Sequence, residues 1–488
     1  MTLPAHLNDR KLHVAIVGAG PAGIYAADLL TKSQPVASGE LDVAIDLFDE
    51  LPTPFGLIRY GVSPDHPRIK GIITALHKVM DKEQIRFIGN VSFGRDLTLE
   101  DLQERYDAVV FATGAQKDAD LNIPGIDLDG SHGAADFVSW YDAHPDVARE
   151  WDLSAREVAV IGNGNVALDV ARILSKHADQ LLETEIPEHL YAQLNDSAVT
   201  DVHVFGRRGP AQVKFTPLEL RELSHSKDVD IVLYPEDFEF DAASDEAIKT
   251  NNQVKTMVST LTNWLVEQEE REESGEEAPQ ASRRLHLHFL QSPVEILGED
   301  GRVAGLRMER QELDGTGNAR GTGELVDYPV QAVYRAVGYF GSALEGLEYD
   351  GARGVVPNAG GRVLDRDGAP VPGVYTTGWI KRGPVGLIGH TKGDAQETIT
   401  HLLEDLAALP VPAAPGTAPV EDLLAERGVR YTDWAGWLTL DEHERSLGAA
   451  TGTVQTRFGP VERERIKVVE RDAMLEHAAA AVLEPVES

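Results

Sequence analysis

Two stretches of the chain share one pattern, in which a short apolar run is followed by a glycine-rich turn and a stretch with helical spacing. The first comprises the run Leu12–Val17 and the helical stretch Ile24–Leu30, and the second comprises Val158–Ile161 and Leu168–Leu174. Short apolar runs bounded by turn residues predict strands buried in a parallel sheet. The pattern therefore predicts an α/β protein with two strand–turn–helix units.

Three further apolar runs predict strands beside these units. Val43–Phe48 and Tyr106–Ala112 follow the first unit, and Val202–Phe205 follows the second. We interpret residues 176–200 as an insertion, because they lengthen the usual distance between such a turn and the next strand. The chain is expected to contain two Rossmann-like dinucleotide-binding domains.

The first glycine turn has the features of an FAD site. Its glycines allow the backbone to approach a pyrophosphate, and the N-terminus of the next helix offers N–H groups and a positive dipole end. An acid at the end of the next strand is placed to bind ribose hydroxyls. Proline within the turn and an Ala-Thr-Gly ending of a later strand are typical of FAD-binding units. The predicted FAD contacts are Gly18, Gly20, Pro21, Gly23, Asp49, Thr113 and Gly114.

The second glycine turn has the features of an NADP site. It reads Gly162-Asn163-Gly164-Asn165-Val166-Ala167, with alanine as the accepted variant at the third glycine position. The strand after it is followed by Arg207 and Arg208, where an NAD-specific domain carries an acid. Two guanidinium groups can bind the 2′-phosphate of NADP through charge-assisted hydrogen bonds. We therefore predict NADPH as the nucleotide of this domain.

The charge and hydropathy of the whole chain exclude several kinds of partner. The 488 residues include 45 basic and 80 acidic side chains, which give a formal charge of −35. This surplus of acid repels a phosphate backbone, so we expect no nucleic-acid partner. The apolar runs are far shorter than the ~20 residues that a spanning helix needs, so we expect no membrane insertion. Residues 1–11 carry no signal or transit pattern, and we expect a cytoplasmic monomer whose acidity serves solubility or adaptation to salt.

The chain contains no cysteine. This excludes disulfide scaffolds, Cys-ligated zinc, iron–sulfur clusters and CxxC redox pairs. The sequence also lacks an HExxH zinc motif and a P-loop, so we predict no metal site. Any redox chemistry of this protein must therefore belong to a bound cofactor.

Two segments interrupt the regular pattern. Residues 264–280 are rich in glutamate and are expected to form a helix end that runs into a solvated loop. Prolines at 410, 412, 415 and 419 exclude a regular helix or central strand, so they predict a linker. Beyond it, Trp434, Trp437 and Leu438 make the tail apolar enough to pack on the body.

Six stretches of the chain match a known family. They are VAIVGAGPAGIYAA, TPFGLIRYGVSPDHPRIK, VVFATGA, VAVIGNGNVALDVARIL, VFGRRGPAQVKFTPLELREL and TTGWIKRGPVGLIGHTKGDA. In these stretches, between about Leu12 and Ile399, the chain resembles the adrenodoxin reductase-type ferredoxin-NADP reductases of mitochondria and bacteria. The last four are specific to this family rather than to flavoproteins in general.

The resemblance implies an FAD domain built from both ends of the chain, with an NADP domain inserted into it. The expected boundaries are 1–115 and 342–409 for the FAD domain, 116–341 for the NADP domain, and 410–488 for a linker and an extension that packs on the FAD domain. The resemblance also implies hydride transfer from NADPH to FAD, followed by two single-electron steps from the flavin to a ferredoxin, an acidic iron–sulfur carrier.

The resemblance further assigns a catalytic group by motif position. Trp379 and Gly386 are expected to contact the flavin, and Gly386 to lie near the nicotinamide. His66 and Glu222 match an active-site pair. Hydride transfer between stacked rings needs positioning more than acid–base chemistry, so we expect this pair to orient and tune the site.

Three charged positions carry the remaining assignments from the resemblance. Glu219 matches an acid that faces the nicotinamide end of NADP, and Arg221 matches a position on the face that docks ferredoxin. Asp49 stands where the family usually has glutamate, and the shorter side chain should still reach a ribose.

Other flavoproteins share this plan and define the alternatives. Disulfide reductases and the small subunit of glutamate synthase need cysteines that this chain lacks. A flavin monooxygenase would carry an FxGxxxH signature, which is also missing. The remaining alternatives are a diaphorase-like oxidoreductase that reduces a quinone or oxygen, and a redox-silent FAD-binding interaction protein, which bleaching of the flavin by NADPH would exclude.

Overall fold

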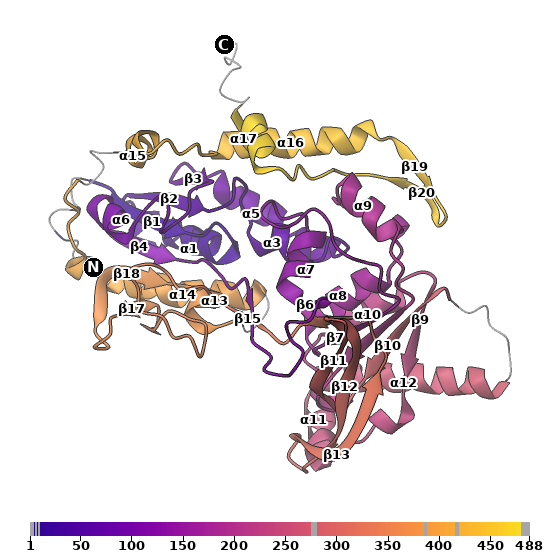
Figure 1. Cartoon of the computed structure of the whole chain (residues 1–488). Coiled ribbons are helices and arrows are strands. Elements are labelled where there is room, and N and C mark those ends of the chain that lie inside the picture. Colours follow the sequence, from indigo (N-terminus) through magenta and orange to yellow (C-terminus); the bar gives the residue numbers. More distant parts are fainter. Residues whose placement is uncertain are drawn as a thin grey trace.

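Two mainly parallel sheets, each covered by helices, organise the computed structural model (Figure 1). The structure describes residues 4, 7, 10–274, 281–384, 388–414 and 419–479. We call the part built around the larger sheet the first unit and the part built around the smaller sheet the second unit. Within the described residues, no helix is both long enough and apolar enough to span a membrane.

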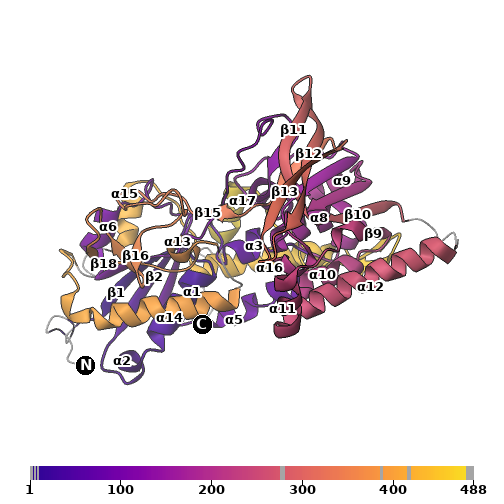
Figure 2. The same ribbon diagram turned by 90° about the horizontal axis from the view of Figure 1, so that it is seen from below.

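The first unit is built on a seven-stranded sheet with the order β16-β17-β18-β4-β1-β2-β3. Its strands are β1 Leu12–Val17, β2 Val43–Asp49, β3 Ile85–Gly89, β4 Ala108–Phe111, β16 Asn358–Ala359, β17 Arg362–Leu364 and β18 Pro370–Thr376. Its helices are α1 Pro21–Thr31, α2 Gln34–Ala37, α3 Leu57–Tyr60, α4 Pro67–Lys70, α5 Ile73–Met80, α6 Leu99–Arg105, α13 Trp379–Arg382 and α14 Ile388–Glu404. Helix α14, from the later part of the chain, packs beside α1 (Figure 2).

The second unit is built on a six-stranded parallel sheet with the order β6-β14-β7-β8-β10-β9. Its strands are β6 Ser131–Gly133, β7 Glu157–Ile161, β8 Asp201–Phe205, β9 Val229–Leu233, β10 Arg283–His288 and β14 Ala332–Arg335. Its helices are α7 Ala134–Tyr141, α8 Asn165–Ser175, α9 Glu188–Asn195, α10 Pro217–Ser224, α11 Ala242–Thr250 and α12 Asn252–Ser274. An antiparallel sheet also belongs to this unit and consists of β11 Gln291–Glu299, β12 Arg302–Leu313 and β13 Ala319–Tyr328. Apolar residues of β11 and β12 pack on the face of the parallel sheet that points away from α8.

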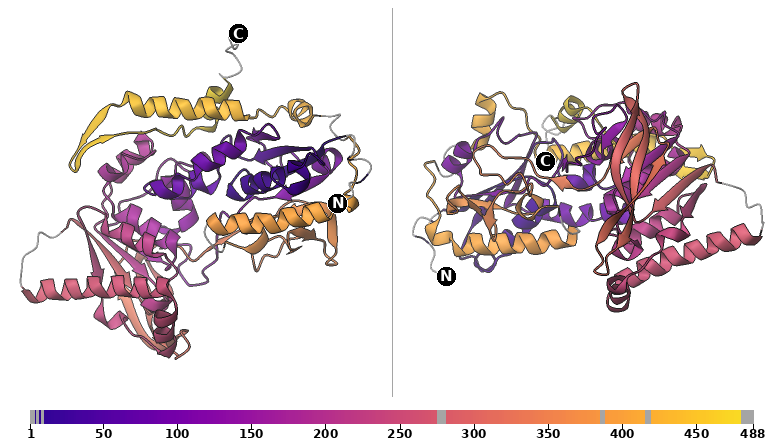
Figure 3. Two further views of the ribbon diagram at one scale, coloured as in Figure 1. Left: turned by 180° about the vertical axis from the view of Figure 1, so that it is seen from behind. Right: turned by 60° about the horizontal axis from the view of Figure 1, so that its bottom comes forward.

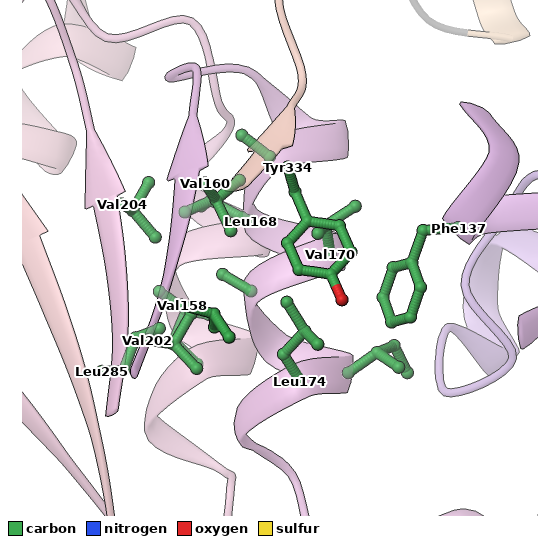
Figure 4. Packing of buried hydrophobic residues seen from close by; sticks show 14 of the residues in the cluster. Phe137, Val158, Val160, Leu168, Val170, Leu174, Val202, Val204, Leu285 and Tyr334 are labelled. Carbon is green, nitrogen blue, oxygen red and sulfur yellow. The ribbon is translucent and has the colours of Figure 1, made fainter. Parts of the chain in front are cut away.

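Burial on both faces explains the continuous apolar runs in the second sheet. Val158 and Val160 of β7 point toward α8, where Leu168 and other apolar side chains of the helix meet them (Figure 4). The alternate residues Ala159 and Ile161 pack in a second cluster with residues of β11 and β12. Because successive side chains of a strand point to opposite faces, a strand covered on both sides has no polar alternation.

The chain crosses between the units twice, at nearly the same place. Strand β5 Lys117–Asp118 leaves the first unit and β15 Tyr339–Phe340 returns to it, and the two pair antiparallel. The strands of the second unit all lie between these crossings, whereas the first sheet takes strands from both sides of them. This arrangement confirms the expected α/β fold with one Rossmann-like domain inserted into another.

The C-terminal extension packs on both units, and not only on the first unit as expected from the sequence. It consists of α15 Val420–Glu426, α16 Trp434–Ala450, β19 Thr453–Thr456, β20 Gly459–Glu462 and α17 Arg471–Ala479. Trp437 is buried in the core of the first unit, while Leu438 is 40% exposed. The hairpin of β19 and β20 reaches α9 of the second unit (Figures 1 and 3), where Arg463 pairs with Glu188. The physical reason is charge, because the buried cations Arg463 and Lys467 of this segment pair with carboxylates of the second unit.

Two sequence predictions lie partly outside the described residues. The acidic helix end is α12, which runs to Ser274, and residues 275–280 are outside. The proline-rich segment is described to residue 414, and residues 415–418 are outside.

Candidate functional site

Each glycine turn lies at the carboxyl end of a central strand where the strand order reverses. In the first sheet β1 lies between β2 and β4, and in the second sheet β7 lies between β8 and β14. In both sheets the next strand along the chain pairs on one side of this central strand, and a later strand pairs on its other side. Ligands of open α/β sheets bind in the crevice at such a switch point.

The three glycines of the first turn have different surroundings. A Cβ atom on Gly18, where φ is +111°, would lie 2.4 Å from the carbonyl oxygen of Ala112, and one on Gly23 would lie 2.0 Å from that of Gly18. These two positions exclude a side chain because backbone crosses them. A Cβ on Gly20 would meet no described protein atom closer than the Cα of Gly56, at 3.9 Å. Gly20 therefore leaves room for a ligand, as the second glycine of a dinucleotide-binding turn does.

The second turn has the same division of roles. A Cβ on Gly162, where φ is +148°, would lie 2.3 Å from the carbonyl oxygen of Ala336, whereas one on Gly164 would meet no described atom within 4 Å. Gly20 and Gly164 are the N-caps of α1 and α8, and among the described residues no side chain caps either helix. N–H groups in the first turn of each helix, in α1 those of Ala22 and Gly23 because Pro21 has none, are thus available to an anion.

Asp49 supports the first turn through its carboxylate. It accepts hydrogen bonds from the N–H groups of Ala19 at 2.8 Å and Leu51 at 3.0 Å. Burial raises the pKa of Asp49 to about 7, although these two hydrogen bonds favour the charged form. Each oxygen keeps a second lone pair, so ribose binding by Asp49 remains compatible with these bonds and stays a prediction.

Segments from both parts of the chain border the first turn. Thr113 and Gly114 follow β4, and at Gly114, where φ is +75°, an added Cβ would meet no described atom within 4 Å. From the later part, a Cβ on Gly378 would lie 2.6 Å from the Cβ of Ala22 in α1. The N–H of Gly378 is held by Asp394 of α14 at 2.5 Å. The expected FAD contacts thus converge on one place.

Trp379 opens α13 directly beside this place. Its ring is half-buried and lies nearly parallel to the ring of Tyr339, with the two centroids 6.5 Å apart. Tyr339 belongs to the returning strand β15, so the pair lies where the two units join. Gly386, expected near the flavin and the nicotinamide, lies outside the described residues.

In the second unit, side-chain and backbone hydrogen bonds hold the glycine turn against the segment before α10. The carbonyl of Asn163 accepts from the N–H of Lys214 at 3.0 Å, and Asn165 Oδ1 accepts from the N–H of Thr216 at 3.0 Å. Val166 lies in the first turn of α8. All these residues lie at the switch point, and their contact with NADP stays a prediction.

Arg207 and Arg208 lie on the loop that follows β8. Arg207 is exposed and Arg208 is half-buried. Within the part of the chain that the structure describes, neither guanidinium forms an ion pair or a hydrogen bond. Both donors are therefore free for an anionic ligand beside the second turn.

His66 does not pair with Glu222, contrary to the expectation from the family motif. His66 Nε2 lies 2.6 Å from Glu219 Oε2 and 3.0 Å from Asp169 Oδ1. Glu222 Oε2 instead lies 3.6 Å from Nδ1 of His225, the residue that follows α10, and 30% of the Glu222 side chain is exposed. Glu219 is buried and reaches His66, whereas Glu222, almost one turn later on the same side of α10, is partly exposed and lies near His225 instead.

A buried network of charges surrounds His66 and joins the two units. Asp65 of the first unit receives two hydrogen bonds of 2.8 Å from Arg172 of α8, and Lys176 Nζ lies 2.5 Å from it. Arg172 also donates to Asp169 at 2.8 Å. Three carboxyl groups thus face one guanidinium and one ammonium group, and a protonated His66 balances the charge.

The pKa values agree with this count. Burial alone would lower the pKa of His66, but the hydrogen bonds to Asp169 and Glu219 outweigh it and raise the pKa to about 9. Burial alone would raise the pKa of Asp65, but Arg172 and Lys176 hold it well below its usual value. Both shifts favour the ionised forms.

Sequence reasoning missed Asp65, Asp169, Arg172 and Lys176, which form most of this network. One signal was present, because Asp169 and Arg172 interrupt the apolar helical stretch Leu168–Leu174. Charged residues on a helix that is otherwise apolar are paired when buried. That signal predicts a buried ion pair but does not name its partner.

Three buried histidines of the second sheet form a separate cluster. His203, His286 and His288 stack with nearly parallel rings on β8 and β10. His203 Nδ1 lies 3.0 Å from His288 Nε2, and His286 contacts Asp201 and Tyr234 through its two nitrogens. Because the facing nitrogens of His203 and His288 contact each other and both nitrogens of His286 are engaged by Asp201 and Tyr234, we assign this cluster to sheet packing.

The residues of both turns fit dinucleotides. Each turn combines an open glycine, an uncapped helix N-terminus and a neighbouring strand end, and these features suit a pyrophosphate. The first turn adds a carboxylate at a strand end and an aromatic ring, and the second adds two free guanidinium groups. The set therefore fits FAD at the first turn and NADP at the second.

Comparisons with known proteins agree with this geometry. A family model described as pyridine nucleotide-disulphide oxidoreductase matches residues 12–203. NADPH-ferredoxin reductase FprA of Mycobacterium tuberculosis is 42% identical over 461 residues, which cover 92% of this chain and 97% of that protein. The mitochondrial NADPH:adrenodoxin oxidoreductase of Bos taurus is 39% identical over 91% of this chain and 89% of its own length. The solved structure of Mycobacterium tuberculosis FprA in complex with NADPH superposes with a TM-score of 0.85 at 40% identity, covering 96% of this chain and all of that chain.

Proposed function

This chain belongs to the family of NADPH-ferredoxin and adrenodoxin reductases, and from this premise we propose that it carries electrons from NADPH through FAD to a ferredoxin. The family resemblance seen in the sequence is thereby confirmed. The protein is a flavoprotein oxidoreductase that binds FAD and NADP. The observation that carries the proposal is the pair of ligand-sized turns, each with an open glycine at a switch point and both beside the junction of the units.

We assign FAD to the first unit and NADPH to the second. Support for FAD comes from Gly20, Asp49, Gly114 and the Gly378–Trp379 segment, which converge from both ends of the chain. Support for NADPH comes from Gly164 and from the free guanidinium groups of the loop after β8. When bound, FAD accepts a hydride from NADPH and passes on its electrons one at a time.

The residues of the chain position the reacting groups. The charge network holds the segment before α4 against α8 and α10, so that the two turns keep a fixed relation. His66 keeps a proton beside Glu219 and Asp169 at the junction. Trp379 and Tyr339 place two aromatic rings there, inclined by 28° with centroids 6.5 Å apart, and aromatic faces of this kind suit contact with a planar ligand.

The ferredoxin partner follows from the family, and its docking face is our inference. Arg221 is exposed on α10, two residues after buried Glu219, and its side chain has no ion pair within the described residues. We propose that Arg221 belongs to the docking face and that the enzyme acts as a monomer. The free cation lies close to the junction of the units, which is where an electron acceptor must approach.

Purified protein tests the proposed function directly. It should contain one non-covalent FAD per chain, be bleached rapidly by NADPH and slowly by NADH, and reduce a ferredoxin of its own organism in an NADPH-dependent assay. A preparation that neither contains nor takes up flavin contradicts the proposal. Reduction of quinones or oxygen with no reduction of any ferredoxin would instead favour a diaphorase-like enzyme.

A further inference from the structure

Lys214 lies beside the second glycine turn and keeps its ammonium group free. It is exposed, and its side chain forms no ion pair or hydrogen bond within the part of the chain that the structure describes. The other cations of the junction differ, since Arg172 and Lys176 are buried and bound to carboxylates. A free cation at this place is available to a ligand.

The backbone fixes where Lys214 stands. Its N–H donates to the carbonyl of Asn163 at 3.0 Å, and two residues later the N–H of Thr216 donates to Asn165 Oδ1 at 3.0 Å. The segment 214–216 therefore runs along the glycine turn and is tied to it at two points. Asn163 and Asn165 flank Gly164, the open N-cap of α8.

The loop that carries Arg207 and Arg208 also begins beside Asn163. A Cβ on Gly206 would lie 3.3 Å from the Cβ of Asn163, so Gly206 packs against it, and Arg207 and Arg208 follow. Lys214 differs from the arginines because its own backbone is tied to the turn that faces the pyrophosphate. Lysine is also a flexible point charge, which suits phosphate oxygens that are shared with backbone N–H groups.

Local cations are needed here because the chain as a whole repels the nucleotide. The formal charge of the protein is −35, and a dinucleotide phosphate is itself strongly negative. Screening at ~0.1 M salt confines charge effects to about 10 Å, so only cations close to the phosphates counter this repulsion. The backbone of Lys214 lies beside the second glycine turn, within reach of such a position for its side chain.

We propose that Lys214 binds the pyrophosphate of NADPH, and that it strengthens binding without selecting between NADPH and NADH. This inference rests on the proposed function, because it assumes a nicotinamide nucleotide at the second turn. In this proposal selectivity and affinity have different sources. Arg207 and Arg208 bind the 2′-phosphate that only NADP carries, whereas Lys214 binds the pyrophosphate that both nucleotides share.

Calorimetric titration of the FAD-loaded enzyme with NADP+ and, separately, with NAD+ tests the inference. Lys214→Met should weaken the binding of both nucleotides by a similar factor of about tenfold, the size of one charge-assisted contact at an exposed site. Lys214→Arg should restore most of the affinity because it keeps the charge. Lys11→Met is the matched control, because Lys11 is exposed and belongs to the first unit, where it precedes β1 at the end of that strand away from the first glycine turn. This variant should change neither affinity.

Each other result has a clear meaning. Unchanged binding of both nucleotides by Lys214→Met, with NADP+ bound tightly by the wild type, overturns the inference and leaves the proposed function intact. A loss for NADP+ alone also overturns it, because Lys214 would then read the 2′-phosphate. Failure of the wild type itself to bind NADP+ would instead contradict the proposed function.

Discussion

At the scale of single residues, nucleotide choice depends on the two guanidinium groups after β8. Arg207 and Arg208 are free of protein partners within the described residues and stand where an NAD-specific domain carries an acid. We expect the double variant Arg207→Ala, Arg208→Ala to weaken NADPH recognition by about a hundredfold or more, because each charge-assisted hydrogen bond contributes about 1.5–3 kcal/mol. Use of NADH should change little. Steady-state kinetics with both nucleotides measure this, and equal losses for both would contradict it.

The proton of His66 gives a second prediction at this scale. The folded pKa of His66, about 9, lies above the ordinary histidine value of 6.5, so its contacts with Glu219 and Asp169 stabilise the fold fully below about pH 6.5. This contribution is lost as the pH rises through about 9. We expect Glu219→Gln to lower this pKa, because a neutral amide stabilises the imidazolium less than a carboxylate does. NMR titration of labelled histidines measures it, with His66→Gln to assign the signal.

A His66 signal that titrates near pH 6.5 in the wild type would show that the network does not hold the proton. An unchanged pKa in Glu219→Gln, with the signal still near pH 9, would assign the shift to Asp169 alone.

At the scale of elements, periodicity predicted the strands and helices around the turns closely. The run Leu12–Val17 is β1, and the stretch Leu168–Leu174 lies within α8. Buried parallel strands and helices that follow glycine turns carry their signal locally, in residues adjacent along the chain. The pairing of His66 with Glu219 rather than Glu222 could not be predicted in this way, because it depends on where along its length α10 meets the other unit.

The C-terminal extension is an element whose role depends on buried charge. Arg59 of α3 forms a two-pronged pair with Glu444 of α16, and both side chains are buried. Lys467 donates to the carbonyls of Arg59 at 2.6 Å and Asp142 at 2.9 Å, and lies 2.9 Å from Glu185. The extension thereby links the two units, since Arg59 belongs to the first and Glu185 to the second.

Removing one partner of this linkage should destabilise the fold. We expect Glu444→Ala to lower the free energy of unfolding by about 3–5 kcal/mol, because it leaves the buried guanidinium of Arg59 unpaired. Glu442→Ala, two residues away and exposed, should change it by less than about 0.5 kcal/mol. Denaturant unfolding followed by circular dichroism compares the two, and equal stabilities would show that the pair contributes nothing.

At the scale of the whole molecule, the interleaved order of the two domains came from the family resemblance rather than from periodicity. Nothing local in β16 to β18 shows that these strands join the sheet of β1, because the pairing spans the entire second unit. The same limit applies to the extension, whose contacts with both units depend on residues far apart along the chain.

The charge of the whole molecule leads to a prediction about docking. A protein of formal charge −35 meets an acidic ferredoxin against long-range repulsion, so a local free cation at the junction matters. We expect Arg221→Glu to raise the KM for ferredoxin while NADPH-dependent reduction of ferricyanide stays nearly intact, because a small inorganic acceptor needs no docking face. Parallel loss of both activities would place Arg221 in the nucleotide site or the fold, and no loss would remove it from docking.

The central claim is that electrons pass from NADPH through the flavin to ferredoxin, and anaerobic rapid mixing tests it most directly. Enzyme reduced by one equivalent of NADPH is mixed with excess oxidised ferredoxin while the flavin and iron–sulfur absorption are followed together. Because a hydride carries two electrons and a ferredoxin accepts one, we predict that the flavin is reoxidised as two ferredoxins are reduced per NADPH. A flavin that stays reduced while ferredoxin stays oxidised would contradict the claim.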